Sequence, residues 1–257
     1  MDELVENAIG RAIDLMCRNM AERVTLDDMA RAAMFSKFHF SRIFHKATGV
    51  SPGRFLAAIR MQEAKNLLLA TSLNVTEISQ RVGYQSVGTF SSRFRSSVGI
   101  SPSTYRRLGG GALQVCGTTA RRPPTSNPPA TLRGRIGVPE IPAGLGKIFV
   151  GLFPDRLPEG RPVRCTVLGE PGPFEFDDVP LGTWYLLSYS ASADRDLVAP
   201  SPQAPEKGLY VGSSGPITIR PGVRWPFADL VLRPMNRMDP PVLLALLDAR
   251  VLQGVGT

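Results

Sequence analysis

The chain has 257 residues, of which 43% are hydrophobic and 20% are charged, so it can form two domains with buried cores. It has no run of about 18 apolar residues, which excludes a membrane span, and its acidic start predicts no signal peptide. Its three cysteines, Cys17, Cys116 and Cys165, are scattered and odd in number. They exclude a disulfide framework and a zinc motif, and they are typical of a cytoplasmic protein.

The formal net charge of +8 is concentrated in one part of the chain. Residues 36–110 hold 11 Lys and Arg but only 2 Asp and Glu, whereas residues 123–257 hold 13 of each kind. A basic stretch of this length is typical of a surface that binds a polyanion. An ordinary solvated face has the same composition, so the motifs must distinguish the two.

A repeat with an offset of 50 residues organises the N-terminal part. FSRIFHKATGVSP at 40–52 matches FSSRFRSSVGISP at 90–102, and LDDMARAAMFS before the first matches VTEISQRVGYQS before the second with one inserted residue. Each copy predicts a short helix, a tight turn, a longer helix, a Gly C-cap and a Ser-Pro start of the next helix. We therefore predict an all-α domain over 1–108, with helix-turn-helix units at about 24–50 and 74–100 joined by a helix over 53–70.

The longer helix of the first unit divides into two faces. The spacing i, i+3, i+4, i+7 gives a core stripe of Phe40, Ile43, Phe44 and Ala47. The opposite face carries Phe38, Ser41, Arg42 and His45. Arg can fork onto guanine, Ser can reach either base edge and Phe can lie against a thymine methyl, so this face suits the major groove of DNA. An ordinary surface helix with one exposed Phe is the alternative, and the repeat together with the local charge favours DNA.

The longer helix of the second unit offers fewer long side chains. Phe90 and Phe94 anchor it, and Arg93 occupies the position that matches the core residue Ile43, where its stem can cover apolar surface while its head reaches a phosphate. Its outward positions are Gly88, Ser91, Ser92 and Arg95. We expect it to recognise backbone and shape more than base edges, about 34 Å along the DNA from the first helix.

Four motifs link these units to a known family. They are Arg60-x-x-x-Ala64-x-x-Leu67-Leu68, Ile78-Ser79-x-x-Val82-Gly83-Tyr84, Thr89-Phe90-Ser91-x-x-Phe94-Arg95 and Gly99-x-Ser101-Pro102-x-x-Tyr105-Arg106. Through them, residues 24–107 resemble the DNA-binding module of AraC/XylS transcriptional regulators, with Ser79 where the family usually has Ala and Ser92 where it usually has Arg. Most relatives carry this module at the C-terminus.

The resemblance implies that helices near 36–48 and 86–98 enter successive major grooves. It implies that the first helix contacts DNA through Lys37, Phe38, Ser41, Arg42 and His45. It implies that the second helix contacts DNA through Val87, Thr89, Ser91, Ser92 and Arg95. We also predict DNA contacts by Arg93 and Arg106. Ser92 in place of Arg again indicates that the second helix reads bases weakly.

The remainder of the chain has a different composition. Of 23 prolines, 21 lie from Pro123 onward, and residues 109–130 read as a flexible linker. Short segments such as LRGRI, KIFVGLF, PFEFDDV, TWYLLSY, LYVG and ITIRP then predict an all-β antiparallel sandwich over 131–257. The string from Gly172 to Tyr185 resembles transthyretin-like and carboxypeptidase regulatory-like domains. Residues 241–253, PVLLALLDARVLQ, predict a short C-terminal helix for packing or dimer formation.

Nothing in the sequence supports catalysis. Both histidines, His39 and His45, lie in the first helix-turn-helix unit, so the second half has no histidine for a triad or a metal site. Cys116 and Cys165 lack the Pro-Cys-His-Arg-like context of the alkyltransferases that accompany this module in some proteins. We expect no enzyme activity, no cofactor and no metal.

We therefore predict a cytoplasmic, sequence-specific regulator of transcription that binds double-stranded DNA and makes no membrane contact. The resemblance implies activation through RNA polymerase, while repression stays open. A homodimer through the C-terminal domain and an unknown small-molecule effector stay open as well. The alternative is an interaction or scaffolding protein whose β domain does the work and whose helix-turn-helix module tethers it to DNA.

Overall fold

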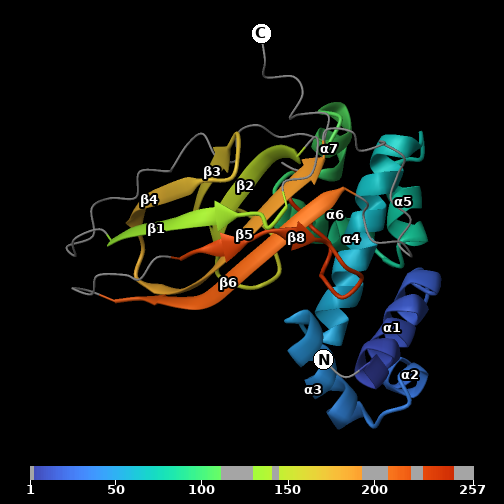
Figure 1. Cartoon of the computed structure of the whole chain (residues 1–257). Coiled ribbons are helices and arrows are strands. Elements are labelled where there is room, and N and C mark those ends of the chain that lie inside the picture. The colour runs from blue at the N-terminus through green and yellow to red at the C-terminus, as the bar shows by residue number, and fades with distance from the viewer. Residues whose placement is uncertain (1–2, 111–129, 141–144, 193–207, 221–227, 246–257) are drawn as a thin grey trace. The chain divides into compact units, whose positions relative to one another are not determined.

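The computed structural model describes residues 3–110, 130–140, 145–192, 208–220 and 228–245 (Figure 1). These residues form two compact units. The helical unit consists of residues 3–110 together with residues 236–245, and the sheet unit consists of the described residues between 130 and 235. We had expected the β domain to include everything from 131 onward, but the chain returns to the helical unit at Asn236.

Seven helices form the described part of the helical unit. They are α1 (Glu3–Arg18), α2 (Leu26–Ala32), α3 (Lys37–Thr48), α4 (Pro52–Ala70), α5 (Val75–Arg81), α6 (Val87–Val98) and α7 (Pro102–Arg107). The sequence analysis did not predict α1, although its buried face, with Ala8, Ile9, Ala12, Ile13 and Met16, follows helical spacing. The short and long helices of both repeats lie where we predicted them.

The two copies of the repeat are built in the same way. The first copy has a fully buried aromatic cluster of Phe40, Phe44 and Phe55, in which the ring of Phe44 lies 5.4 Å from each of the others. In the second copy the ring of Phe94 lies 5.8 Å from Phe90 and 5.6 Å from Tyr105. The offset of 50 residues therefore relates the two cores as well as the sequences.

The caps also repeat. Thr25 and Asp28 form a capping box at the start of α2, and Asn74 and Glu77 form one at the start of α5. Both long helices end at a glycine in the left-handed conformation, as predicted, and both next helices begin with Ser-Pro. The turns match too, since Met34 (φ 59°) and Gly83 (φ 84°) occupy the same left-handed position. A side chain at Gly83 would lie 2.5 Å from the Met20 carbonyl oxygen, which explains why only the second turn needs glycine.

Residues 236–245, which we call the strap, complete the helical unit. The guanidinium of Arg237 donates to the Gly10 carbonyl at 2.9 Å and to the Asp14 carboxylate at 2.6 Å, both in α1. Further along, the carbonyl of Val242 accepts a hydrogen bond from Lys65 of α4 at 3.1 Å. Val242, Leu243 and Leu244 are buried. The strap therefore contacts both α1 and α4, although it lies more than 120 residues beyond α7 in the sequence.

Eight strands form two sheets in the described part of the sheet unit. They are β1 (Ala130–Gly137), β2 (Leu145–Phe153), β3 (Arg164–Leu168), β4 (Pro173–Val179), β5 (Gly182–Ser192), β6 (Leu209–Ile219), β7 (Leu230–Val231) and β8 (Arg233–Pro234). One sheet has the order β4-β1-β7 and the other β3-β2-β5-β6-β8. All pairs are antiparallel except β1 with β7, which is parallel.

The two sheets share one apolar core. The three-stranded sheet contributes Leu132, Ile136, Phe174, Phe176 and Leu230. The five-stranded sheet contributes Ile148, Val150, Leu152, Leu186 and Ile219. In β1 every second residue from Leu132 to Ile136 is buried, which is the period of a strand with one face on a core.

Two expectations for this half differ from the structure. LYVG and ITIRP were expected as separate strands, but they belong to one strand, β6, which passes through Gly215 and a cis bond to Pro216. The predicted C-terminal helix is not present over 241–244, where the chain is irregular, and residues 246–257 lie outside the described residues. Most of the predicted linker, residues 111–129, also lies outside them.

Candidate nucleic-acid interface

The long helix α3 presents the polar face that we expected opposite its core. Phe40 and Phe44 are fully buried, while Lys37, Arg42 and His45 are exposed and Ser41 is half-buried. Phe38 is 90% exposed, although it is a large apolar side chain. A fully exposed aromatic ring among basic and polar groups has no partner within the helical unit, and its position suits contact with a ligand.

A residue that the sequence analysis did not select orients one of these groups. Arg42 donates a hydrogen bond to Nδ1 of His39 at 3.3 Å, and the His39 ring lies 4.8 Å from the ring of Phe35 in the preceding turn. The i, i+3 spacing of His39 and Arg42 is the sequence signal that could have identified this pair. His39 is therefore the side chain within α3 on which the exposed Arg42 guanidinium rests.

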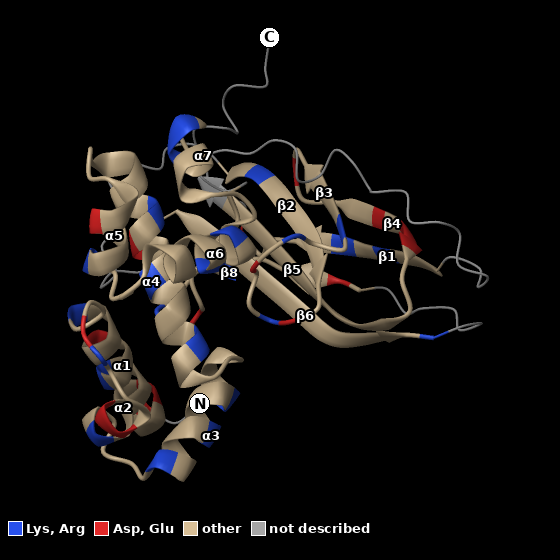
Figure 2. Cartoon of the chain, turned by 180° about the vertical axis from the view of Figure 1, so that it is seen from behind, with Lys and Arg blue, Asp and Glu red and all other residues tan. Residues whose placement is uncertain are grey.

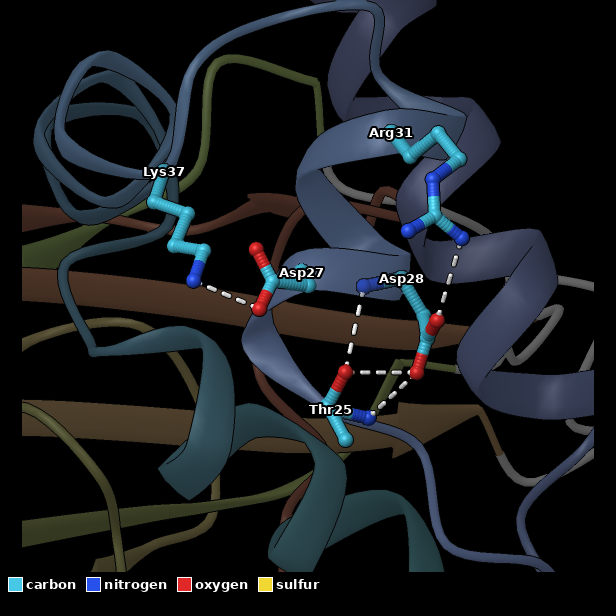
Figure 3. Close-up of polar contacts among 5 residues, drawn as sticks. All are labelled: Thr25, Asp27, Asp28, Arg31 and Lys37. Carbon is cyan, nitrogen blue, oxygen red and sulfur yellow. Dashed lines mark hydrogen bonds and ion pairs between the residues drawn. The ribbon is translucent and has the colours of Figure 1, made fainter.

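Lys37, the first residue of α3, forms an ion pair with α2. Its ammonium lies 2.6 Å from the carboxylate of Asp27, and both side chains are about half exposed. Figure 3 shows this pair beside the capping box of α2. There, the hydroxyl and the backbone amide of Thr25 donate to the Asp28 carboxylate at 2.6 and 2.9 Å, which lowers the pKa of Asp28. Asp28 thus caps α2, whereas Asp27 pairs with the first residue of α3.

The second long helix, α6, has a similar polar face with shorter side chains. Val87, Thr89, Ser92 and Arg95 are exposed, whereas Ser91 and Arg93 are half-buried. Phe90 and Phe94 hold the opposite face in the core. Arg95 is therefore the long basic side chain that α6 exposes.

Arg106 is engaged inside the helical unit. Its guanidinium donates to the carbonyls of Leu68, Thr71 and Leu73 at 2.9, 3.3 and 2.6 Å, so it joins α7 to the loop before α5. Arg60 does the same for the loop before α2, with bonds to Met20 and Glu22 at 2.8 and 2.7 Å. We predicted that Arg106 contacts DNA, but its guanidinium is engaged with three backbone carbonyls, which are contacts that position a helix-turn-helix unit.

The formally charged side chains of α3 and α6 are all basic. Neither α3 nor α6 contains Asp or Glu, and Figure 2 shows the Lys and Arg segments of α3 in blue without red. Carboxylates lie instead on the short helices, with Asp27 and Asp28 in α2 and Glu77 in α5. Such an arrangement attracts a polyanion to the long helices.

Two further observations concern other functions. Among the described residues, no group of three or more His, Cys, Asp or Glu side chains is placed to hold a metal ion. No helix in the same part of the chain is long and apolar enough to cross a membrane.

Comparison with known proteins identifies the helical unit. A helix-turn-helix domain family matches residues 29–108. The lactose operon transcription activator of Staphylococcus xylosus is 35% identical over 104 residues, which are 40% of this chain and 37% of that protein. The HTH-type transcriptional activator AarP of Providencia stuartii is 36% identical over 88 residues, which are 34% of this chain and 65% of that protein. The chain therefore covers less than two thirds of the length of either relative.

A solved structure is also similar. It is the C-terminal domain of AraT, a response regulator from Geobacillus stearothermophilus, which is 33% identical, with a TM-score of 0.38. The similarity covers 42% of this chain and 86% of that one.

Proposed function

We propose that the protein is a transcriptional activator of the AraC/XylS type that binds a bipartite promoter site, because residues 29–108 match a helix-turn-helix domain family. Each long helix, α3 and α6, enters a major groove on one face of the DNA, about one helical turn (~34 Å) apart. The two named relatives are transcription activators, which supports this sign of regulation. Such a protein works in the cytoplasm and is not an enzyme.

The observation that carries this proposal is the duplicated pair of polar faces. Both α3 and α6 turn aromatic residues into a core and expose side chains that donate hydrogen bonds, with no carboxylate on either helix. A helix of this kind fits the major groove, where base edges and phosphates accept hydrogen bonds. The duplication of this face supports the proposal that the protein engages two successive grooves.

In this proposal, α3 and α6 contact different parts of the DNA. The face of α3 carries Arg42, His45 and Phe38, which reach base edges and thymine methyl groups. The face of α6 carries mainly short side chains, so it contributes through phosphates and DNA shape, with Arg95 on a phosphate. Lys37, Ser41, Val87, Thr89, Ser91, Ser92 and Arg93 complete the proposed contact set.

The sheet unit regulates the helical unit through contacts of its own, with a second copy, with another protein such as RNA polymerase, or with an effector. Two sheets over one core support the proposal that this unit is an antiparallel sandwich. The return of the chain to the helical unit at Asn236 supports coupling between the two units. The described sheet unit is then preceded and followed in the chain by segments of the helical unit.

Footprinting of the full-length protein on genomic DNA fragments tests the proposal. We expect two protected segments on one face of the duplex, and a steep loss of affinity with salt, with a log–log slope of about −5 or steeper. The full chain is needed because the strap belongs to the helical unit. Binding without a discrete footprint would favour the alternative, in which the helical unit only tethers an interaction domain to DNA. A flat salt dependence would contradict DNA binding by the basic surface.

A further inference from the structure

The junction between α2 and α3 holds a charge pair that the second copy of the repeat lacks. In the first copy the carboxylate of Asp27 lies 2.6 Å from the ammonium of Lys37. At the matching positions, the second copy has Thr76 and Val87, which cannot form an ion pair. The turn itself folds in the same way in both copies. The pair is therefore not a requirement of the helix-turn-helix fold.

The pair also contributes little to stability, because both of its side chains are about half exposed to water. The cap of α2 does not depend on it, since Asp28 makes the capping hydrogen bonds. Lys37 occupies the first position of α3, where the partial positive charge of the helix end disfavours a cation. Asp27 offsets this charge and offers the ammonium a partner at 2.6 Å beside the start of α3.

We propose that Asp27 is a specificity-determining residue, which prevents Lys37 from binding phosphates on DNA of arbitrary sequence. This inference rests on the proposed function. Binding to arbitrary DNA depends almost entirely on the neutralisation of phosphates by Lys and Arg side chains. An ammonium that is held and neutralised by Asp27 adds little to such binding, and the carboxylate itself repels nearby phosphates. On the correct site, the base contacts of α3 supply much of the affinity, so the charge at Asp27 has a smaller effect there.

The test compares Asp27→Asn with the wild-type full-length protein on two probes. One probe is a duplex of random sequence, and the other is a site selected by the wild-type protein from a random pool. We expect Asp27→Asn to increase affinity for the random duplex about three- to tenfold, and to make its log–log salt slope steeper by about 1. Affinity for the selected site should change by less than about twofold, so that the ratio of the two affinities falls.

Two matched variants separate this role from a general charge effect. Glu6→Gln also removes one exposed carboxylate from the helical unit, but it lies in the first turn of α1 and should leave the ratio unchanged. In a Lys37→Gln background, Asp27→Asn should no longer lower the ratio, because the cation that it releases is gone.

The inference is overturned if Asp27→Asn behaves like Glu6→Gln, if both probes gain equally, or if the effect persists in the Lys37→Gln background. A wild-type protein that binds neither probe would instead overturn the proposed function itself. The two failures are therefore distinguishable.

Discussion

The ammonium of Lys65 in α4 donates a hydrogen bond to the carbonyl of Val242, 177 residues further along the chain, at 3.1 Å. Lys65 is only 2% exposed, and its ammonium also lies 5.9 Å from the centre of the Tyr105 ring in α7. A buried ammonium must have acceptors, because an unsatisfied one is costly. The strap therefore supplies a hydrogen-bond acceptor to α4, the helix that connects the two copies of the repeat.

This contact predicts that Lys65 and the strap stabilise the protein together. Lys65→Met should lower the free energy of unfolding by about 1.5–3 kcal/mol in the full chain, because it removes a charged donor and leaves the Val242 carbonyl unpaired. In a chain that ends at residue 235, the same substitution should cost less, because the bond to Val242 is already absent and the contacts with Gln62 and the Tyr105 ring remain. Denaturant unfolding followed by helical circular dichroism measures both. A chain that ends at residue 245 is the control and should retain the full cost, whereas equal costs in all three chains would contradict the coupling.

Arg106 should act on stability and not on DNA contact. Arg106→Ala removes bonds to three carbonyls and should lower the free energy of unfolding by about 2–4 kcal/mol. The neighbouring Arg107 is exposed, and Arg107→Ala should change stability by less than about 0.5 kcal/mol. Chemical denaturation of the two variants decides the matter. An Arg106→Ala protein of normal stability that loses DNA affinity would instead support the DNA contact that we predicted from the sequence.

Arg42 and Arg95 should differ in what they recognise. Arg42 is exposed on α3 and is oriented by His39, so Arg42→Ala should weaken binding to a selected site by about 1–3 kcal/mol and binding to random DNA much less. Arg95 is the long exposed cation of α6, and Arg95→Ala should weaken both alike. Titrations of both variants on both probes test the assignment, which fails if the two substitutions have the same profile.

Cys17 should make stability depend on alkaline pH. Burial and, to a smaller extent, the Asp14 carboxylate raise the pKa of Cys17 from 9.0 to about 11. Between these two values the folded state binds more protons than the unfolded state, so stability declines as pH rises. The difference in unfolding free energy between wild type and Cys17→Ala should be constant below pH 9 and shrink toward pH 11. Taking the difference cancels lysines and tyrosines that titrate in the same range, and a difference independent of pH would contradict this account.

The helical unit was largely predictable because its repeat is explicit in the sequence. The matched Phe40 and Phe90 specify the core, and the Gly-x-Ser-Pro that ends each copy specifies the C-cap and the next N-cap, which are local features. The helix α1 was missed because it has no counterpart in the repeat, although its apolar spacing was visible. The sequence could not show that Arg106 binds three carbonyls, since that depends on where the loop at Thr71 lies.

The sheet unit and the strap were harder to predict for a physical reason. The strands were recognisable from their period, but pairing between strands distant in the sequence, such as β1 with β7, is not encoded locally. Leucines after Pro241 fit a helix and a buried irregular segment equally well. Asp27 was also overlooked, because the sequence does not show whether Lys37 of the next helix lies close enough to form an ion pair with it.

Because of the strap, a cut of the chain between residues 110 and 130 does not coincide with the boundary between the two folded units. A protease site engineered into residues 111–129 would yield two fragments, and the second would carry the segment that binds α1 and α4. The cut halves should therefore remain together and elute as one species from a gel-filtration column. They should dissociate when Arg237 and the buried leucines of the strap are replaced. The two fragments thus form a split-protein pair, and their reassociation would measure whether the helical unit is folded with its strap in place.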